Sequence, residues 1–259
     1  MQQTLGYTTL GNGPETIFFL HDWFSDQSSY DNFRPYLNTG FYKFVFLDLR
    51  GYGRSKGIYG SCTLEEASKD VITIADKLNI EQFHLVGHSM SGQIVQYIPI
   101  EAPGRIKSIA AICPVPACGN PVPDDVMEHL EAVTKGDMVN GKAIVNFMTQ
   151  NRYHDWFAER KALHWFSCSS PQARAAYLHM FCETDVSDQV KGLDIPMLVV
   201  CGDYDAPAHS AQRLQQTICQ DFKKAQLVCL PSGHYPMEET PVILAATLER
   251  FWDNVTLKI

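Results

Sequence analysis

The chain of 259 residues carries a formal net charge of −8 at pH 7, and 45% of its residues are hydrophobic and 19% are charged. This composition excludes a disordered chain, and the excess of acidic residues argues against nucleic acid as a partner. The length is that of one large α/β domain with an insertion.

The first 113 residues alternate short apolar runs with a longer amphipathic segment. Four runs predict buried strands: residues 16–20 (TIFFL), 43–47 (KFVFL), 83–86 (FHLV) and 106–112 (IKSIAAI). Residues 63–78 have apolar positions at helical spacing, with Thr63 and Glu66 placed as a capping box. Strands that alternate with helices predict a parallel sheet.

The pattern changes at residue 114. A proline-rich exit, PVPACGNPVP, leads into about eighty residues of mainly helical character. Within them, Ser170 and Pro171 are typical of a helix start. We interpret residues 114–193 as a helical lid inserted into a core made of residues 1–113 and 194–259.

The alternation returns after the lid. Residues 197–201 (MLVVC) and 225–230 (AQLVCL) predict strands, and residues 208–218 and 241–252 predict helices. These segments complete the sheet.

The stretch LVGHSMSGQ, residues 85–93, places Ser89 in a tight turn between a strand and a helix. Such a turn holds the side chain at the carboxyl edge of a parallel sheet, where ligands of open α/β sheets bind. The helix start adds unpaired amides that favour negative charge beside Ser89. A serine is a poor nucleophile at neutral pH and needs a base, which in turn needs an orienting partner.

Two later loops supply such partners. Asp205 follows the strand 197–201 in GDYDAPAH, and His234 follows the strand 225–230 in PSGHYPMEETP. Three parallel strands therefore direct Ser89, Asp205 and His234 to one edge of the sheet. Asp203 lies in the same loop as Asp205 and is the alternative acid, although pairing with the turn's backbone is the better interpretation of Asp203.

With these residues the chain resembles the α/β-hydrolase-fold family over most of its length outside the lid. The resemblance rests on FFLHDW, DLRGYGRS, GHSMSG, GDYD and SGHYPMEETP, and on the chain order serine, acid, histidine. It implies a mostly parallel central sheet flanked by helices, with an inserted helical lid.

The resemblance also implies roles for single residues. Ser89 corresponds to the nucleophile, His234 to the general base and then acid, and Asp205 to its orienter. The backbone NH groups of Trp23 and Met90 correspond to the oxyanion hole. No cofactor or metal is implied.

The sequence departs from the family pattern at two positions. Ser91 stands where the nucleophile turn has its second glycine, and we expect this small residue to be tolerated. Asp22 stands where the family has the glycine of its HG pair. Asp adopts left-handed backbone angles better than most residues, but its carboxylate, if it borders the substrate, opposes negative charge in the oxyanion hole.

The remaining histidines are better interpreted as structural. His21 and His88 flank the proposed site, and we expect each to be hydrogen-bonded instead of acting as a second base. His154, Asp155 and His164 in the lid lack the spacing of a zinc motif, so we predict no metal site.

The lid is rich in aromatic residues, and most are expected to form its own core. They are Phe147, Tyr153, Trp156, Phe157, Trp165, Phe166, Tyr177 and Phe181. Trp156 and Trp165 are our candidates for the walls of a mainly apolar substrate pocket, and Asp22 is a third candidate for contact with the substrate.

The eight cysteines form no CxxC pair, and Cys113, Cys201 and Cys229 end or lie within apolar runs. We expect reduced, mostly buried thiols. No run of about 18 apolar residues, the length of a membrane helix, occurs. Residues 1–13 lack the basic start and apolar stretch of a signal peptide. These features predict a cytoplasmic protein without a membrane partner.

The sequence therefore predicts a serine hydrolase that cleaves a carboxylic ester or lactone of a small to medium, largely apolar molecule. Two alternatives stay open. One is C–C bond hydrolysis or cofactor-free oxygenation of an aromatic ring on the same scaffold. The other is a ligand sensor whose lid movement signals to a partner. Substrate identity and oligomeric state are not predicted.

Overall fold

A seven-stranded sheet forms the centre of the molecule, in a computed structural model that describes residues 4–256. The strand order is β1-β3-β2-β4-β5-β6-β7, with β1 antiparallel to β3 and the other neighbours parallel. The strands are β1 (Tyr7–Leu10), β2 (Glu15–Leu20), β3 (Tyr42–Leu47), β4 (Phe83–His88), β5 (Ile106–Ile112), β6 (Met197–Gly202) and β7 (Ala225–Leu230).

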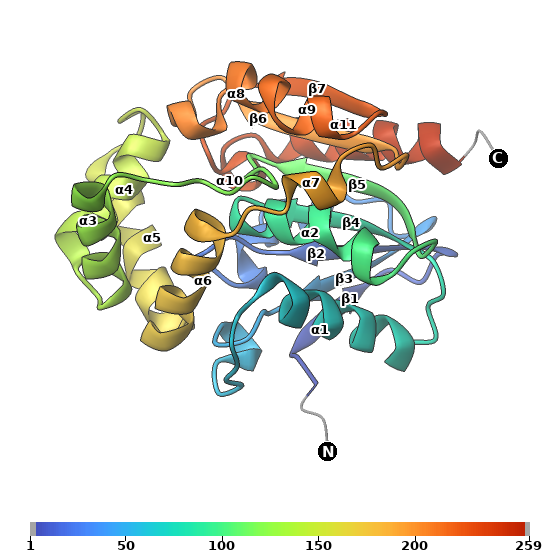
Figure 1. Cartoon of the computed structure of the whole chain (residues 1–259), viewed down its shortest axis with the longest axis horizontal. Helices are drawn as coiled ribbons and strands as arrows, with labels where there is room; N and C mark the ends of the chain where they lie inside the picture. The colour runs from blue at the N-terminus through green and yellow to red at the C-terminus, as the bar shows by residue number, and fades with distance from the viewer. Residues whose placement is uncertain (1–3, 257–259) are drawn as a thin grey trace.

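Helices cover the sheet and extend beyond one end of it (Figure 1). The α-helices are α1 (Leu64–Lys77), α2 (Met90–Glu101), α3 (Asp124–Thr134), α4 (Met138–Met148), α5 (Asp155–Cys168), α6 (Pro171–Glu183), α7 (Ser187–Val190), α8 (Ala211–Gln216), α9 (Ile218–Asp221), α10 (Pro236–Glu239) and α11 (Pro241–Thr256). Short 3₁₀ turns are η1 (Gln27–Tyr30), η2 (Arg34–Tyr36), η3 (Gly53–Ser55) and η4 (Pro207–His209). The architecture confirms the predicted α/β-hydrolase fold class with its mostly parallel sheet.

The predicted strands all form, and the main differences lie elsewhere. The sequence analysis missed β1, a short edge strand. The helix predicted at residues 208–218 is broken into η4, α8 and α9. Ser210 starts a new helix by accepting a hydrogen bond from the Arg213 amide (3.4 Å), and Thr217, at φ −114° and ψ −90°, interrupts it. The side chain of Thr63 caps α1 as predicted, but Glu66 accepts from the amide of Cys62 (2.8 Å) and not from that of Thr63.

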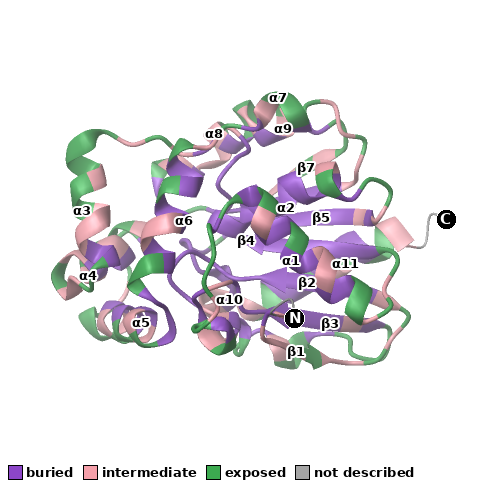
Figure 2. Ribbon diagram, turned by 60° about the horizontal axis from the view of Figure 1, so that its bottom comes forward, coloured by how far each residue is buried: buried purple, intermediate pink, exposed green. Residues whose placement is uncertain are grey.

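Buried aromatic side chains hold α11 against the sheet. Trp252 packs on Phe19, Phe44 and Tyr42, with ring centroids 6.2, 6.2 and 5.5 Å away. Strands β2 to β6 are almost entirely buried, the edge strands β1 and β7 are less so, and exposed residues follow the outer surfaces of the helices (Figure 2). Aromatic packing of this kind stabilises beyond the area it buries, by about 0.5–1.5 kcal/mol per pair.

Four helices, α3, α4, α5 and α6, stand together beyond the end of the sheet, at the left of Figure 1. We call them the lid helices. They meet the core through backbone hydrogen bonds, such as those from the His234 amide to Met148 (3.0 Å) and from the Ser170 amide to Gly51 (2.8 Å). The division into a core of residues 1–113 and 194–259 and a lid of residues 114–193 stays a prediction.

The expectation of reduced thiols is wrong for two cysteines. Cys201 in β6 and Cys229 in β7 form a disulfide, with Cα atoms 4.7 Å apart. The two residues are register partners in adjacent parallel strands, a proximity that a separation of 28 positions in sequence does not reveal. The other six cysteines are free.

Among residues 4–256 no helix is both long enough and apolar enough to cross a membrane.

Candidate active site

Ser89 occupies the turn between β4 and α2 in a backbone conformation that few residues other than glycine adopt. Its φ is 55° and its ψ is −117°. The turn is held by hydrogen bonds from the Ser89 amide to Ile112 O (2.9 Å), and from the amides of Gly92 and Val115 to Ser89 O (2.8 and 2.9 Å). Such strain persists only where the surroundings impose it, as they do at many functional sites.

Two close approaches explain the small residues around the turn. A Cβ atom at Gly87 would lie 2.3 Å from Ser91 O, and one at Gly92 would lie 2.3 Å from the Cβ of Pro114. Ser91, by contrast, is accommodated. Its side chain is fully buried and its hydroxyl donates to the carbonyl of His21, which joins the nucleophile turn to the loop after β2.

The structure brings the three predicted catalytic side chains together. Ser89 Oγ lies 2.9 Å from His234 Nε2, and His234 Nδ1 lies 3.0 and 2.9 Å from the two carboxylate oxygens of Asp205. Asp203 is exposed on the same turn, so Asp205 and not Asp203 faces the imidazole. Because a carboxylate only accepts hydrogen bonds, Nδ1 carries the proton and Nε2 presents a lone pair to the Ser89 hydroxyl.

Burial sets the resting charge of this group. Burial lowers the pKa of His234 to about 4, although the Asp22 carboxylate acts in the opposite direction. Burial raises the pKa of Asp205, against the nearby His209 and the hydrogen bond from the Ala206 amide. His234 is therefore a neutral imidazole at pH 7, which can accept a proton from a hydroxyl.

The two residues proposed for the oxyanion hole come from two different loops, the turn after β4 and the loop after β2. Met90 begins α2, so its amide has no acceptor within the helix. Trp23 follows the turn after β2, and its indole donates to the carbonyl of Arg174 in α6 (2.7 Å). The Trp23 ring packs against Phe24 and Phe181, with centroids 3.8 and 5.1 Å away.

Asp22 is buried beside the triad and faces His88. Asp22 Oδ1 and His88 Nδ1 lie 3.9 Å apart, and within residues 4–256 neither atom has a hydrogen-bond partner. His88 Nε2 donates to the carbonyl of His234 (2.7 Å), so in a neutral ring Nδ1 is an acceptor. At 3.9 Å the two atoms are too far apart for a direct hydrogen bond.

His21 and His88 have the hydrogen bonds expected of structural histidines. His21 Nδ1 donates to Asp22 O (2.7 Å) and His21 Nε2 accepts from the Leu49 amide (3.0 Å). Burial lowers the pKa of His88 to about 4. The two rings therefore shape the loops around Ser89 and His234.

The two tryptophans predicted to line the pocket are placed very differently. Trp156 lies on α5 with 66% of its side chain exposed, so solvent and not a pocket surrounds it. Trp165 is 1% exposed and stacks on Phe24, with centroids 4.6 Å apart. Trp165 thus forms a second layer behind the Trp23–Phe24 pair.

Glu239 is an important residue that sequence reasoning missed. Its buried carboxylate accepts from the amides on both sides of His234, those of Gly233 (2.7 Å) and Tyr235 (2.9 Å), and from the Tyr153 hydroxyl (2.8 Å). Arg152 adds an ion pair at 3.2 Å. Glu239 therefore joins the histidine loop to the segment between α4 and α5; the EET after His234 was the only sequence signal.

A second acid, Glu238, forms ion pairs with two cationic side chains of α5. It pairs with Arg160 (2.9 Å) and with the buried Lys161, whose Nζ lies 3.7 Å from the centroid of the Tyr235 ring. Burial would raise the pKa of Glu238, but Lys161 and Arg160 hold it below its ordinary value.

Two groups of side chains in the described chain gather three metal-ligating atoms within 4.8 Å. One is Cys113, Asp205 and His234, which belongs to the triad. The other is Asp26, His164 and Cys168, which lies between the lid helices and the loop after β2.

Comparison with known proteins gives a consistent result. The model of the Alpha/beta hydrolase family matches residues 17–247. The dihydrolipoyllysine-residue acetyltransferase component of the acetoin cleaving system of Cupriavidus necator is 34% identical over 110 residues, which is 42% of this chain and 29% of that protein. The 3-oxoadipate enol-lactonase 1 of Acinetobacter baylyi is 27% identical over 82% of each chain.

Solved structures share the fold. A thermophilic esterase from Thermogutta terrifontis superimposes with a TM-score of 0.82 at 21% identity, over 97% of this chain and 93% of that one.

Proposed function

The chain belongs to the alpha/beta hydrolase family, and on that premise we propose that it cleaves a carboxylic ester or lactone through an acyl-enzyme formed on Ser89. The observation that carries this proposal is the continuous hydrogen-bonded series from Ser89 Oγ through His234 to Asp205. A nucleophile, its base and the orienter of that base are the parts that acyl transfer needs.

The steps follow from the resting charges. Ser89 Oγ attacks the carbonyl carbon while its proton passes to His234 Nε2, and Asp205 stabilises the resulting imidazolium. That proton then goes to the leaving alkoxide as the bond from carbon to the leaving oxygen breaks. Water, activated by the same imidazole, attacks the acyl-enzyme, and the acid leaves as Ser89 regains its proton.

The amides of Met90 and Trp23 support the negative charge that develops on the carbonyl oxygen. Removing one donor of this type costs about 3–4 kcal/mol of transition-state stabilisation. Asp22 would oppose this charge if it were ionised and exposed to the substrate. Its burial and its approach to His88 favour a carboxyl group that is turned away from the substrate.

Two observations bear on the class of substrate. The name of the enol-lactonase relative makes a lactone a suitable substrate. The Trp23 and Phe181 rings beside the proposed oxyanion hole favour an apolar acyl group of small to medium size. We keep ester and lactone together as one proposal, with a small molecule as the only partner, and a cytoplasmic location stays a prediction.

Labelling with a fluorophosphonate probe tests the mechanism directly. We expect one adduct, mapped by mass spectrometry to Ser89, and hydrolysis of short aryl esters and lactones that disappears in Ser89→Ala. Ser68→Ala is the matched control, because Ser68 is a fully buried serine on α1 whose Oγ has no partner among the described residues.

The outcomes separate the alternatives. A label elsewhere than Ser89, or none, contradicts the acyl-enzyme. Oxygen consumption with an aromatic substrate that survives Ser89→Ala supports the oxygenase. Ligand binding without turnover in the wild type supports the sensor.

A further inference from the structure

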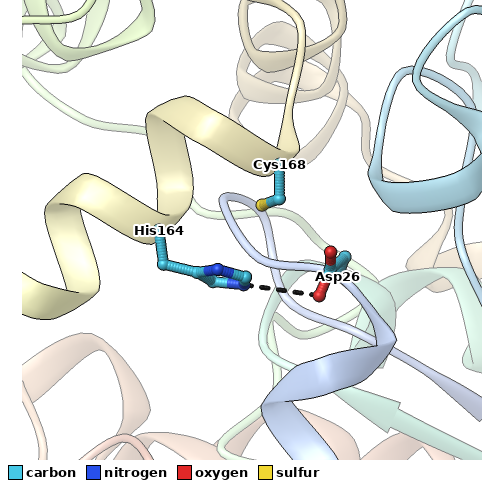
Figure 3. Close-up of side chains that lie close together, drawn as sticks. All are labelled: Asp26, His164 and Cys168. Atoms are coloured by element: carbon cyan, nitrogen blue, oxygen red, sulfur yellow. Dashed lines mark ion pairs between the residues drawn. The ribbon is translucent and has the colours of Figure 1, made fainter.

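The side chains of Asp26, His164 and Cys168 converge where a lid helix meets the loop after β2 (Figure 3). We infer that they form a site for a single divalent metal ion of the zinc class, separate from the triad. This inference does not depend on the hydrolase mechanism.

The site is built by two elements. His164 and Cys168 lie four residues apart on α5, a spacing that puts both side chains on one face of the helix. Asp26 precedes η1 in the loop that also carries Trp23. In Figure 3 the imidazole, the thiol and the carboxylate point toward a common space.

The distances suit a tetrahedral ion. Ligand atoms about 2.1 Å from a tetrahedral zinc stand about 3.4 Å from one another. His164 Nε2 and Asp26 Oδ1 are 3.3 Å apart, and all three ligand atoms lie within 4.8 Å of one another. Small side-chain rotations therefore suffice to close the site.

The chemistry of the donors selects the metal. One imidazole nitrogen, one carboxylate oxygen and one sulfur match zinc and its substitute cobalt, and fit magnesium or calcium poorly. With Cys168 as a thiolate, the two negative ligands neutralise a divalent ion. Cys168 is buried, so binding would release its proton to solvent, as is usual for thiolate sites.

A fourth ligand can come from solvent. His164 is 38% exposed and, with Ser28, borders a cavity of about 310 Å³ that also includes Ser25 and Asn32. The cavity leaves room for a metal-bound water beside His164.

The ion would fix α5 against the loop of the proposed oxyanion hole. Cys168 Sγ already lies 3.4 Å from the carbonyl of Phe24, next to Trp23, and Phe24 stacks on Trp165 of the same helix. The alternative is a purely structural cluster, since Asp26 also caps η1 by accepting from the Ser28 amide (2.9 Å) and pairs with His164.

Titration of the full chain with Co²⁺, after a chelator has removed bound metal, distinguishes a metal site from a purely structural cluster. We expect one equivalent of Co²⁺ to give visible bands of tetrahedral strength and a thiolate-to-cobalt charge-transfer band in the near ultraviolet. Zinc should displace both signals. Cys168→Ser should remove the charge-transfer band, and His164→Gln should weaken binding at least tenfold.

Two cysteine variants serve as controls. Cys182→Ser removes another buried cysteine of the lid helices and should leave the cobalt spectrum unchanged. Cys113→Ser should also leave it unchanged; loss of the band in that variant would place the ion at the triad and overturn the inference.

A stability measurement covers the case in which Cys168→Ser folds poorly. Zinc should raise the melting temperature of the wild type more than that of His164→Gln, a substitution at a partly exposed position. Equal shifts of the melting temperature in both proteins would contradict the inference, as would a wild type without a thiolate band in excess cobalt. The cluster would then be only a cap of η1 and an ion pair.

Discussion

The loops at the end of the sheet and the lid helices that cover them are positioned by different interactions. Ser89, Asp205 and His234 each follow a parallel strand, and the register of β4, β5, β6 and β7 fixes where those strands end. The lid helices and the segment between α4 and α5 meet the same loops through charged and aromatic side chains and a few backbone hydrogen bonds.

The contrast teaches where chemistry and selectivity are encoded. A strand ladder tolerates no slip, so side chains at its end keep hydrogen-bonding distances. A helix that docks through side-chain contacts can change its surface residues without moving the triad. The core loops therefore specify the reaction, and the lid helices are free to specify the substrate.

The largest effect should come from the acid of the triad. Asp205→Asn keeps the shape of the side chain but replaces the carboxylate with a neutral amide whose NH2 group can face His234 Nδ1 and impose the wrong tautomer, so we expect kcat to fall about 10⁴-fold. Steady-state kinetics on the ester identified by the serine test measure it. Asp203→Asn, two residues earlier and exposed, is the matched control and should stay within about twofold. A large loss in Asp203→Asn and none in Asp205→Asn would reverse the assignment.

A smaller loss of kcat should follow when the hydrogen bonds that join the histidine loop to the segment between α4 and α5 are weakened. The Glu239 carboxylate accepts hydrogen bonds from the amides on both sides of His234. Glu239→Gln leaves only one acceptor oxygen for these two donors. We expect kcat to fall about 10²-fold, the size of effect that follows displacement of a catalytic group by about 1 Å. Substrate KM should change little.

The control for that change is Glu183→Gln, which removes an exposed carboxylate whose one ion pair within residues 4–256 is with His179 (2.7 Å). It should leave kcat unchanged. An unaltered kcat in Glu239→Gln, with a lower free energy of unfolding, would show that Glu239 stabilises the lid contact without positioning His234.

Sequence reasoning succeeded for residues that directly follow a predicted strand. The order of strands and loops placed Ser89, Asp205 and His234 at one edge, and the structure joins them. It could not show that Glu239 turns back to clasp the loop of His234, because that depends on the path of a turn.

The same reasoning failed where packing between elements decides. Trp156 and Trp165 are both aromatic residues of α5, yet one is 66% exposed and the other 1%. Asp26 and His164 are 138 positions apart, so no spacing rule could have grouped them. Cys201 and Cys229 likewise meet only because β6 and β7 are neighbours in register.

A moderate effect is expected from pH. Protonated His234 cannot accept the Ser89 proton, so kcat/KM should fall as pH drops through about 4, the value to which burial lowers the pKa of His234. The Asp22 carboxylate favours the protonated form, so Asp22→Asn should lower that pKa further and move the acid limb to lower pH. Profiles of kcat/KM between about pH 3.5 and 8, which cover the titration of histidine, measure both effects.

The exposed Asp203→Asn variant again provides the control, and circular dichroism at each pH separates loss of activity from unfolding. An acid limb near the ordinary histidine value of about 6.5 would contradict the role of burial. A limb that moves upward in Asp22→Asn would contradict the direction of the Asp22 effect.

The smallest effect should come from substitution of Trp156, which tests whether this exposed part of the lid helices contributes to substrate binding. The side chain is mostly in solvent, so Trp156→Ala should change the free energy of unfolding by less than about 0.5 kcal/mol and kcat/KM by less than about twofold. Phe147→Ala, at a 59% exposed aromatic residue of α4, should behave alike. If Trp156→Ala alone raises KM tenfold, α5 must turn this face toward the substrate during turnover. Such a turn would move α5 relative to loops that stay fixed, because the strand ladder holds the triad while the side-chain contacts of α5 are exchanged.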